Sequence, residues 1–145
     1  MKRVLFTLLF TFIGFSSLFA QDWQTNLATA KEIAKKEKKP IVLVFQGSDW
    51  CGPCIKLDRD VWSTEEFKKY SKEHFVMLKA DFPKRSKNAL SKEQQERNNA
   101  LAEKYNKNGY FPFVVVLNAK GEVKGTTGYK KMEAVQFEKL LSSYN

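Results

Sequence analysis

The chain has 145 residues, 43% of them hydrophobic, and a formal net charge of +9 at pH 7. Its length and hydrophobic content predict one packed domain of ordinary size. The lysines alternate with acidic and polar residues and lack interleaved exposed aromatic side chains. A solvated surface therefore explains the charge, and a nucleic-acid partner is not expected.

The first twenty residues have the order of features that is typical of a secretory signal peptide. Lys2 and Arg3 give a positive start, and an apolar run and small residues lead to Ala20. We expect a signal peptide over residues 1–20, cleaved after Ala20, and a mature domain over residues 21–145 in the periplasm or secreted. An uncleaved membrane anchor is the alternative, because the apolar run is about long enough to span a bilayer.

Hydrophobic periodicity predicts alternating helices and strands in the mature chain. Trp23, Leu27 and Ala30 recur at helical spacing, whereas 41–45 is a continuous apolar run typical of a strand buried on both faces. The expected elements, in chain order, are a helix over 22–39, a strand over 41–45, a helix from 51 towards 61, a helix after a capping box at Ser63 and Glu66, a strand over 75–80, a helix after Ser91, a strand over 113–117, a hairpin turn over 118–121, a strand over 122–126 and a helix from about 131 to 143.

This order predicts an α/β protein with a central mixed sheet. Strands joined through a crossover helix pair in parallel, whereas the short turn at Gly121 forces antiparallel pairing. Helices before, between and after the strands can cover both faces of the sheet. The expected architecture is a three-layer α/β/α sandwich.

Cys51 and Cys54 are the two cysteines of the chain, and their close spacing suggests chemistry rather than a structural framework. Cys51 follows a buried strand at the start of a helix, where unpaired backbone N–H groups and the helix dipole favour a thiolate. Cys54 lies one turn later. We expect Cys51 to be the accessible nucleophile, and the less exposed Cys54 to resolve its mixed disulfide.

The residues beside the two cysteines suit a site that docks extended polypeptide. Gly52 permits close approach of a substrate backbone, and Pro53 stiffens the first helical turn. Trp50 adds a flat apolar surface next to the nucleophile. These three residues are the candidate substrate-binding residues of the motif.

Two other interpretations of the cysteine pair carry less weight. Tetrahedral zinc needs four ligands, and His74 is the one histidine of the chain, so no metal is expected. An inert disulfide across two residues would close too small a loop to stabilise the fold much. His74 itself receives no role.

The segment from Trp50 to Cys54 resembles the active-site motif of the thioredoxin family, and the predicted order of elements is similar to that fold. The longer segment 45–57 is most similar to exported bacterial thioredoxin-like proteins. The resemblance covers essentially all of residues 21–145 and implies the thioredoxin fold, a redox-active dithiol and no cofactor.

The resemblance also implies a second part of the site, at Phe111 and Pro112. In such proteins the matching proline is cis and lies against the sulfurs, and the backbone beside it can pair with an incoming substrate strand. An ordinary trans proline at a strand start is the alternative. Gly128 matches a family glycine that leaves room beside the site.

Two departures from the family pattern stand out. Phe45 appears where cytosolic members carry a buried acid that is thought to help deprotonate the second cysteine. Asp49, Lys56 or Asp58 can substitute through water, although Asp58 is equally explained as a solvated helix residue. The polar segment 83–99 is longer than expected, either as an enlarged connection or as a determinant of partner choice.

Together these observations predict a monomeric thiol–disulfide oxidoreductase that reduces disulfides of exported proteins and is recharged by an electron donor in the membrane. The direction is not encoded in the motif, so a disulfide isomerase or oxidase is one alternative. A non-catalytic thioredoxin-fold module that binds peptide is the other.

Overall fold

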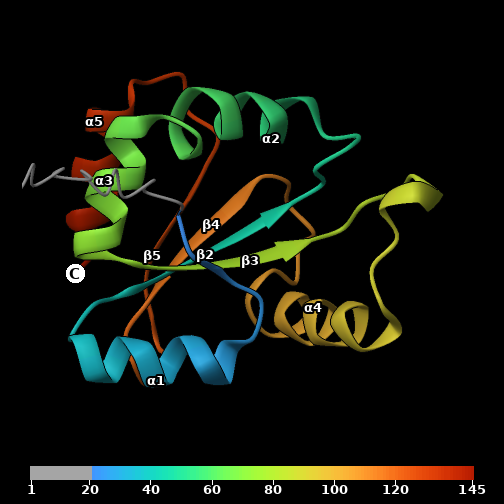
Figure 1. Cartoon of the computed structure of the whole chain (residues 1–145), viewed down its shortest axis with the longest axis horizontal. Coiled ribbons are helices and arrows are strands. Elements are labelled where there is room, and N and C mark those ends of the chain that lie inside the picture. The colour runs from blue at the N-terminus through green and yellow to red at the C-terminus, as the bar shows by residue number, and fades with distance from the viewer. Residues whose placement is uncertain (1–20) are drawn as a thin grey trace, which may run out of the picture.

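The computed structural model describes residues 21–145, so the predicted signal peptide lies outside the described residues. These residues form a five-stranded sheet in the order β1-β3-β2-β4-β5 (Figure 1). Strands β1, β3 and β2 are parallel, and β4 and β5 run antiparallel to their neighbours. The elements are β1 (Trp23–Gln24), α1 (Leu27–Glu37), β2 (Ile41–Gln46), α2 (Gly52–Leu57), the π-helical turn η1 (Asp58–Trp62), α3 (Glu65–His74), β3 (Val76–Asp81), the 3-10 turn η2 (Ser86–Asn88), α4 (Lys92–Tyr105), β4 (Phe113–Leu117), β5 (Val123–Gly128) and α5 (Ala134–Ser142).

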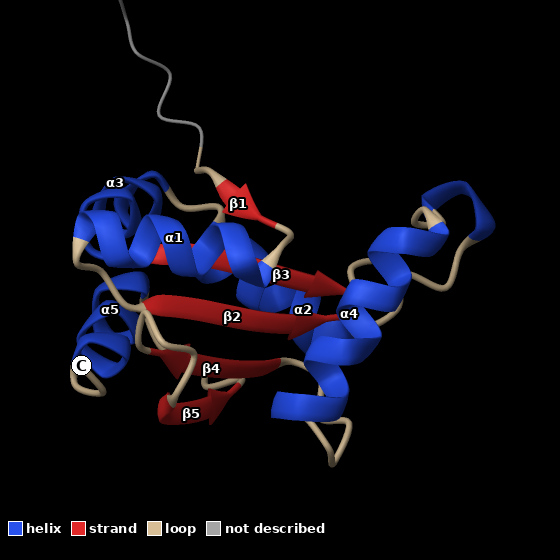
Figure 2. Ribbon diagram, turned by 90° about the horizontal axis from the view of Figure 1, so that it is seen from below, coloured by secondary structure: helices blue, strands red, loops and turns tan. Residues whose placement is uncertain are grey.

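Helices cover both faces of this sheet, as Figures 1 and 2 show, with α1 and α4 on one side and α2, α3 and α5 on the other. Strand β2 is buried along its whole length. Its Val42 and Val44 pack with Trp62 on the α2 side, whereas Leu43 and Phe45 belong to the cluster on the α1 side. Each such side chain contributes about 1.5–3 kcal/mol when fully buried. The predicted three-layer sandwich with a mixed sheet, the thioredoxin fold, is confirmed.

The first predicted helix starts too early, because residues 23 and 24 are a strand. Trp23 pairs with Met77 of β3 and packs its ring edge-on against Trp62, with centroids 6.2 Å apart. Asn26 then caps α1, its side chain accepting a hydrogen bond from the Ala28 N–H at 2.8 Å. The open edge of β3 and this cap outweigh the helical spacing of Trp23.

The predicted cap of the third helix is wrong by one residue. Thr64, not Ser63, caps α3 and accepts a hydrogen bond from the Phe67 N–H at 3.2 Å. Ser63 instead donates to the carboxylate of Asp58 at 3.0 Å. The π-helical turn η1 adds a residue to the path between α2 and α3, which shifts the cap along the chain. The last helix also begins later than predicted, at Ala134.

Among residues 21–145, no helix combines the length and the apolar character that a membrane crossing requires.

Candidate active site

The two cysteines form a disulfide where β2 passes into α2, with their Cα atoms 5.2 Å apart. Cys51 is the N-cap of α2, and its sulfur accepts a hydrogen bond from the backbone N–H of Cys54 at 3.3 Å. Pro53 occupies the first turn, as predicted. The backbone N–H of Cys54 points towards the sulfur of Cys51, an arrangement that stabilises negative charge there once the disulfide is reduced.

Both cysteines are nearly buried in this oxidised state. The exposed fraction is 5% for Cys51 and 3% for Cys54. Cys54 is therefore less exposed than Cys51, as predicted, but only by a small margin. The prediction that Cys51 is accessible does not hold in the oxidised state, in which each sulfur is bonded to the other. Gly52 and Pro53 are exposed, and a Cβ added to Gly52 would meet nothing within 4 Å. The free space at the site lies over these two residues.

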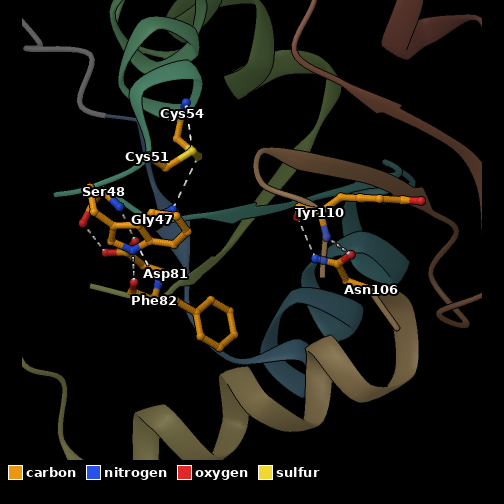
Figure 3. The surroundings of a disulfide bond; sticks show 9 residues. Gly47, Ser48, Cys51, Cys54, Asp81, Phe82, Asn106 and Tyr110 are labelled. Atoms are coloured by element: carbon orange, nitrogen blue, oxygen red, sulfur yellow. Dashed lines mark hydrogen bonds between the residues drawn. A yellow bond between two sulfur atoms is a disulfide. The ribbon is translucent and has the colours of Figure 1, made fainter. Parts of the chain in front are cut away.

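The sulfur of Cys54 faces inward, towards the end of β2. The backbone N–H of Gly47 donates to it at 3.5 Å, as Figure 3 shows. Beside it lies a cavity of about 220 Å³ that receives Asp58 from the turn after α2 and Lys79 from β3. The lining residues are Gln46, Ser48, Cys54, Ile55, Asp58 and Lys79.

This cavity corrects the interpretation of Phe45. Its ring stacks on Phe113 at 6.4 Å within the cluster on the α1 side of the sheet, away from α2. Gln46 is the residue of β2 that shares a cavity with Cys54. Alternation along the strand assigns position 46 to the α2 face, a signal available in the sequence. Of the three substitutes considered for the missing acid, Asp58 alone lines the cavity.

Trp50 sits in an aromatic group beside the disulfide. Its indole N–H donates to the carbonyl oxygen of Phe82 at 2.7 Å, and its ring meets that of Phe111 edge-on at 5.6 Å. Phe111 also contacts Phe82, at 5.5 Å. We call Trp50, Phe82 and Phe111 the aromatic triad. Trp50 remains 40% exposed, so the triad offers apolar surface to a partner.

Gly47 makes this position of Trp50 possible. A Cβ at Gly47 would lie 2.3 Å from the indole ring, far inside contact distance. Any side chain here would displace the tryptophan or the strand end. Sequence reasoning overlooked both Gly47 and Phe82, since their importance depends on a contact between segments that are distant in the chain.

Pro112 lies just before β4, next to Phe111 of the triad, and the Phe111–Pro112 peptide bond is cis, as the family resemblance implied. Asn106 holds the preceding turn: its side chain donates to the carbonyl oxygen of Tyr110 at 2.9 Å and accepts from the Tyr110 N–H at 3.0 Å (Figure 3). Gly128 lies next to this proline, where an added Cβ would be 3.6 Å from the Pro112 carbonyl oxygen. Asn106 was not identified from the sequence.

Two carboxylates complete the site, and neither faces the sulfurs. Asp81 accepts hydrogen bonds from the backbone N–H and hydroxyl of Ser48, at 2.9 and 2.6 Å. Asp49 accepts from the backbone N–H groups of Lys84 and Arg85, at 2.9 and 3.0 Å, and from Asn88. These hydrogen bonds hold the pKa of Asp49 below its ordinary value, and the bond from the Lys84 N–H has the largest effect. The structure gives Asp49 a structural task rather than contact with Cys54.

His74 stacks its ring on Tyr70 at 4.1 Å, at the far end of α3 from the cysteines. Within residues 21–145, no group of three or more histidine, cysteine, aspartate or glutamate side chains is arranged to hold a metal ion.

A disulfide at a helix start, a cis proline just before β4 and this sheet order define the class of thioredoxin-like proteins. A thioredoxin-like family model matches residues 22–119, and the chain belongs to this family. It is 37% identical over 108 residues to the disulfide bond reductase DsbH of Chlamydia pneumoniae, covering 74% of this chain and 63% of that protein. It is 30% identical over 96 residues to the thioredoxin-related protein DsbJ of the same organism, covering 66% and 27%.

The chain thus spans less than two thirds of either relative's length. A solved structure of a DsbH oxidoreductase matches with a TM-score of 0.77 and 32% identity, over 85% of this chain and 83% of that one. The oxidised C-terminal domain of DsbD from Neisseria meningitidis matches with a TM-score of 0.55 and 23% identity, over 81% and 91%, which is a likeness of fold.

Proposed function

We propose that this protein is a thiol–disulfide oxidoreductase that reduces disulfide bonds of exported proteins. The observation that carries the proposal is the Cys51–Cys54 disulfide at the opening of α2, with the N–H of Cys54 directed at the Cys51 sulfur. Cys51 is the catalytic nucleophile and Cys54 the resolving thiol. Trp50, Gly52 and the Phe111–Pro112 segment form the substrate-docking surface.

The reaction starts from the reduced protein. The thiolate of Cys51 attacks one sulfur of a substrate disulfide, forms a mixed disulfide and releases the other substrate sulfur as a thiolate. Cys54 then loses its proton and attacks the Cys51 sulfur, which releases the second substrate thiolate. Two electrons have passed to the substrate, and the protein is left with the Cys51–Cys54 disulfide. Cys54 and Asp58 line the same cavity, so the Cys54 proton can pass to the Asp58 carboxylate or to water there.

The reducing direction is supported by one relative, which is named a disulfide bond reductase, and by the likeness of the Gly52–Pro53 pair to reducing family members. A continuous reductase needs an external dithiol that returns two electrons to Cys51 and Cys54. We propose that residues 1–20 are the signal for export, that the domain works in the periplasm or outside the cell, and that a membrane donor supplies those electrons.

Insulin reduction tests the activity, and titration against glutathione tests the direction. We expect the wild type to precipitate the insulin B chain and Cys51→Ser to fail to do so. The Cys51–Cys54 couple of the wild type should have a reduction potential of about −270 mV. A potential of about −120 mV would instead identify an oxidase. Undiminished cellular function in Cys51→Ser would favour a module that only binds peptide.

A further inference from the structure

A basic loop lies beside the candidate active site. It comprises residues 83–90, between β3 and α4, and contains the turn η2. Lys84, Arg85 and Lys87 are exposed on it, and the loop has no acidic residue. Figures 1 and 2 agree that it projects from the body of the molecule, beyond the ends of β2 and β3. It thus stands at the same end of the sheet as the disulfide.

The three positive charges of the basic loop have no ion-pair partner among residues 21–145. Salt bridges among residues 21–145 involve other cations: Lys39, just after α1, and residues of η1, α3 and α4. The two nearby carboxylates are already engaged, Asp81 by Ser48 and Asp49 by the loop backbone and Asn88. The positive charge of Arg85 helps to lower the pKa of Asp49, although the two side chains form no salt bridge. Most of this charge is available to a partner.

The loop is joined to the surface over the sulfurs through the aromatic triad. The ammonium nitrogen of Lys84 lies 4.0 Å from the ring centroid of Trp50, within the range of a cation–π contact. Trp50 in turn donates to the Phe82 carbonyl, one residue before the loop begins. A peptide lying over Trp50 and Pro112 would therefore pass next to this ammonium group.

Asp49 holds the loop in this position. Its carboxylate receives the first two loop N–H groups and the side chain of Asn88, closing the loop back onto the residue that precedes Trp50. Because the loop backbone that carries the positive side chains is anchored, this backbone needs little further ordering when a partner binds. The tryptophan and the basic loop consequently act as one preorganised surface.

This inference rests on the proposed reductase function. We propose that the basic loop selects polypeptide substrates whose disulfide is flanked by aspartate or glutamate. Trp50 and the Phe111–Pro112 segment receive the part of the substrate that carries the disulfide. Lys84, Arg85 and Lys87 attract and pair with its acidic side chains. A polypeptide is favoured over an anionic membrane because the cations adjoin the peptide-docking surface and the disulfide itself.

The test uses two peptides of equal length, each with one disulfide, flanked either by Asp and Glu or by Lys and Arg. The measurement is the rate constant with which each peptide oxidises the pre-reduced protein, followed by tryptophan fluorescence. The wild type should react about tenfold faster with the acidic peptide at low salt. That preference should shrink as ionic strength approaches about 1 M, where charges are screened within about 3 Å.

Substitution locates the preference. A variant with Lys84→Gln, Arg85→Gln and Lys87→Gln should lower it to less than about twofold. Lys87→Glu should also weaken the preference, and it is a safer variant for folding because the exposed Lys87 side chain makes no hydrogen bond or salt bridge within residues 21–145. The matched control removes three exposed lysines from the opposite end of the sheet, and its preference should equal that of the wild type. The control substitutions are Lys35→Gln, Lys36→Gln and Lys120→Gln.

The outcomes separate the two proposals. Equal rates for both peptides in the wild type would overturn loop selectivity and leave the reductase function standing. Oxidation by neither peptide would overturn both. A control variant that loses the preference as fully as the loop variant would trace it to net charge and overturn the loop's role. An unchanged preference in the loop variants, with loss of binding to phosphatidylglycerol vesicles, would assign the cations to a membrane surface instead.

Discussion

The two segments beside Trp50 are built in opposite ways. The cysteine turn, residues 47–54, hides both sulfurs and is held by backbone N–H groups that point at them. The basic loop is exposed and depends on one carboxylate for its position. Bond exchange needs fixed geometry, whereas partner selection needs accessible charge. Substitutions in the first segment should therefore affect all substrates, and those in the second should affect some.

The largest effect is expected in the cysteine turn, from Cys54→Ser. Without the second sulfur, the mixed disulfide on Cys51 has no internal attacker, so turnover should fall by at least about 10³-fold whatever the substrate. Non-reducing electrophoresis of cell extracts should show adducts that disappear on reduction. The double variant with Cys51→Ser as well should form none. Adducts in the double variant, or none in Cys54→Ser while the wild type is active, would contradict the assigned roles.

Trp50 belongs to both segments, and its removal should give an intermediate effect. Trp50→Ala deletes the exposed ring, the bond to the Phe82 carbonyl and the platform for Lys84. We expect KM for peptide disulfides to rise about tenfold while kcat changes little, because the proposed role of the ring is to bind substrate and not to act on the reacting sulfurs. Trp50→Phe keeps a ring without the N–H and should lie between. A fall in kcat without a rise in KM would contradict this and show that the ring contributes to the bond-exchange step.

The cysteine turn and the basic loop also differ in how well the sequence predicts them. The cysteine turn is encoded locally: a buried strand, a capping cysteine and Pro53 in the first turn are neighbours in the chain. The family resemblance likewise locates Pro112. The environment of Asp49 depends on residues 35 to 39 positions away, so its sequence gives no sign that it holds a loop. Gln46 is the exception, because strand alternation could have placed it on the face opposite Phe45, although the predicted strand ended at residue 45.

A smaller and selective effect is expected from Asp49→Asn. The amide offers one acceptor where the carboxylate offers two, so amide hydrogens of residues 84–88 should exchange faster at neutral pH. The preference for acidic peptides should drop about threefold, with the rate for basic peptides retained. An equal loss for both peptides would show that Asp49 serves the cysteine turn instead.

The pH dependence of that anchor has a definite sign. Because the folded pKa of Asp49 lies below its ordinary value, the anchor is present above the unfolded pKa and is lost as pH falls through the folded one. Exchange rates of the wild type and of Asp49→Asn should therefore converge in acid and differ at neutral pH. A difference that persists at low pH would contradict the ionised anchor.

Glu138 is the opposite of Asp49, because its pKa is raised where that of Asp49 is lowered, and its substitution should have the smallest effect on activity. It is buried on α5, and its Oε1 has no hydrogen-bond partner among residues 21–145. Burial, and secondarily the negative charge of Glu66, raise its pKa. Its stabilising contribution is therefore present below the unfolded pKa and lost as pH rises through the folded one. Glu138→Gln removes that charge and should make the protein about 1 kcal/mol more stable at pH 7, without changing peptide rates.

Urea unfolding at several pH values measures this difference directly. The stabilities of the wild type and of Glu138→Gln should approach one another in acid, where the glutamate is protonated in both the folded and unfolded states. The exposed Glu103→Gln is the matched control and should change stability little at any pH. Destabilisation of Glu138→Gln at pH 7 would mean that the carboxylate is paired in solution. Glu138 would then resemble Asp49, whose ionised form is stabilised by hydrogen bonds.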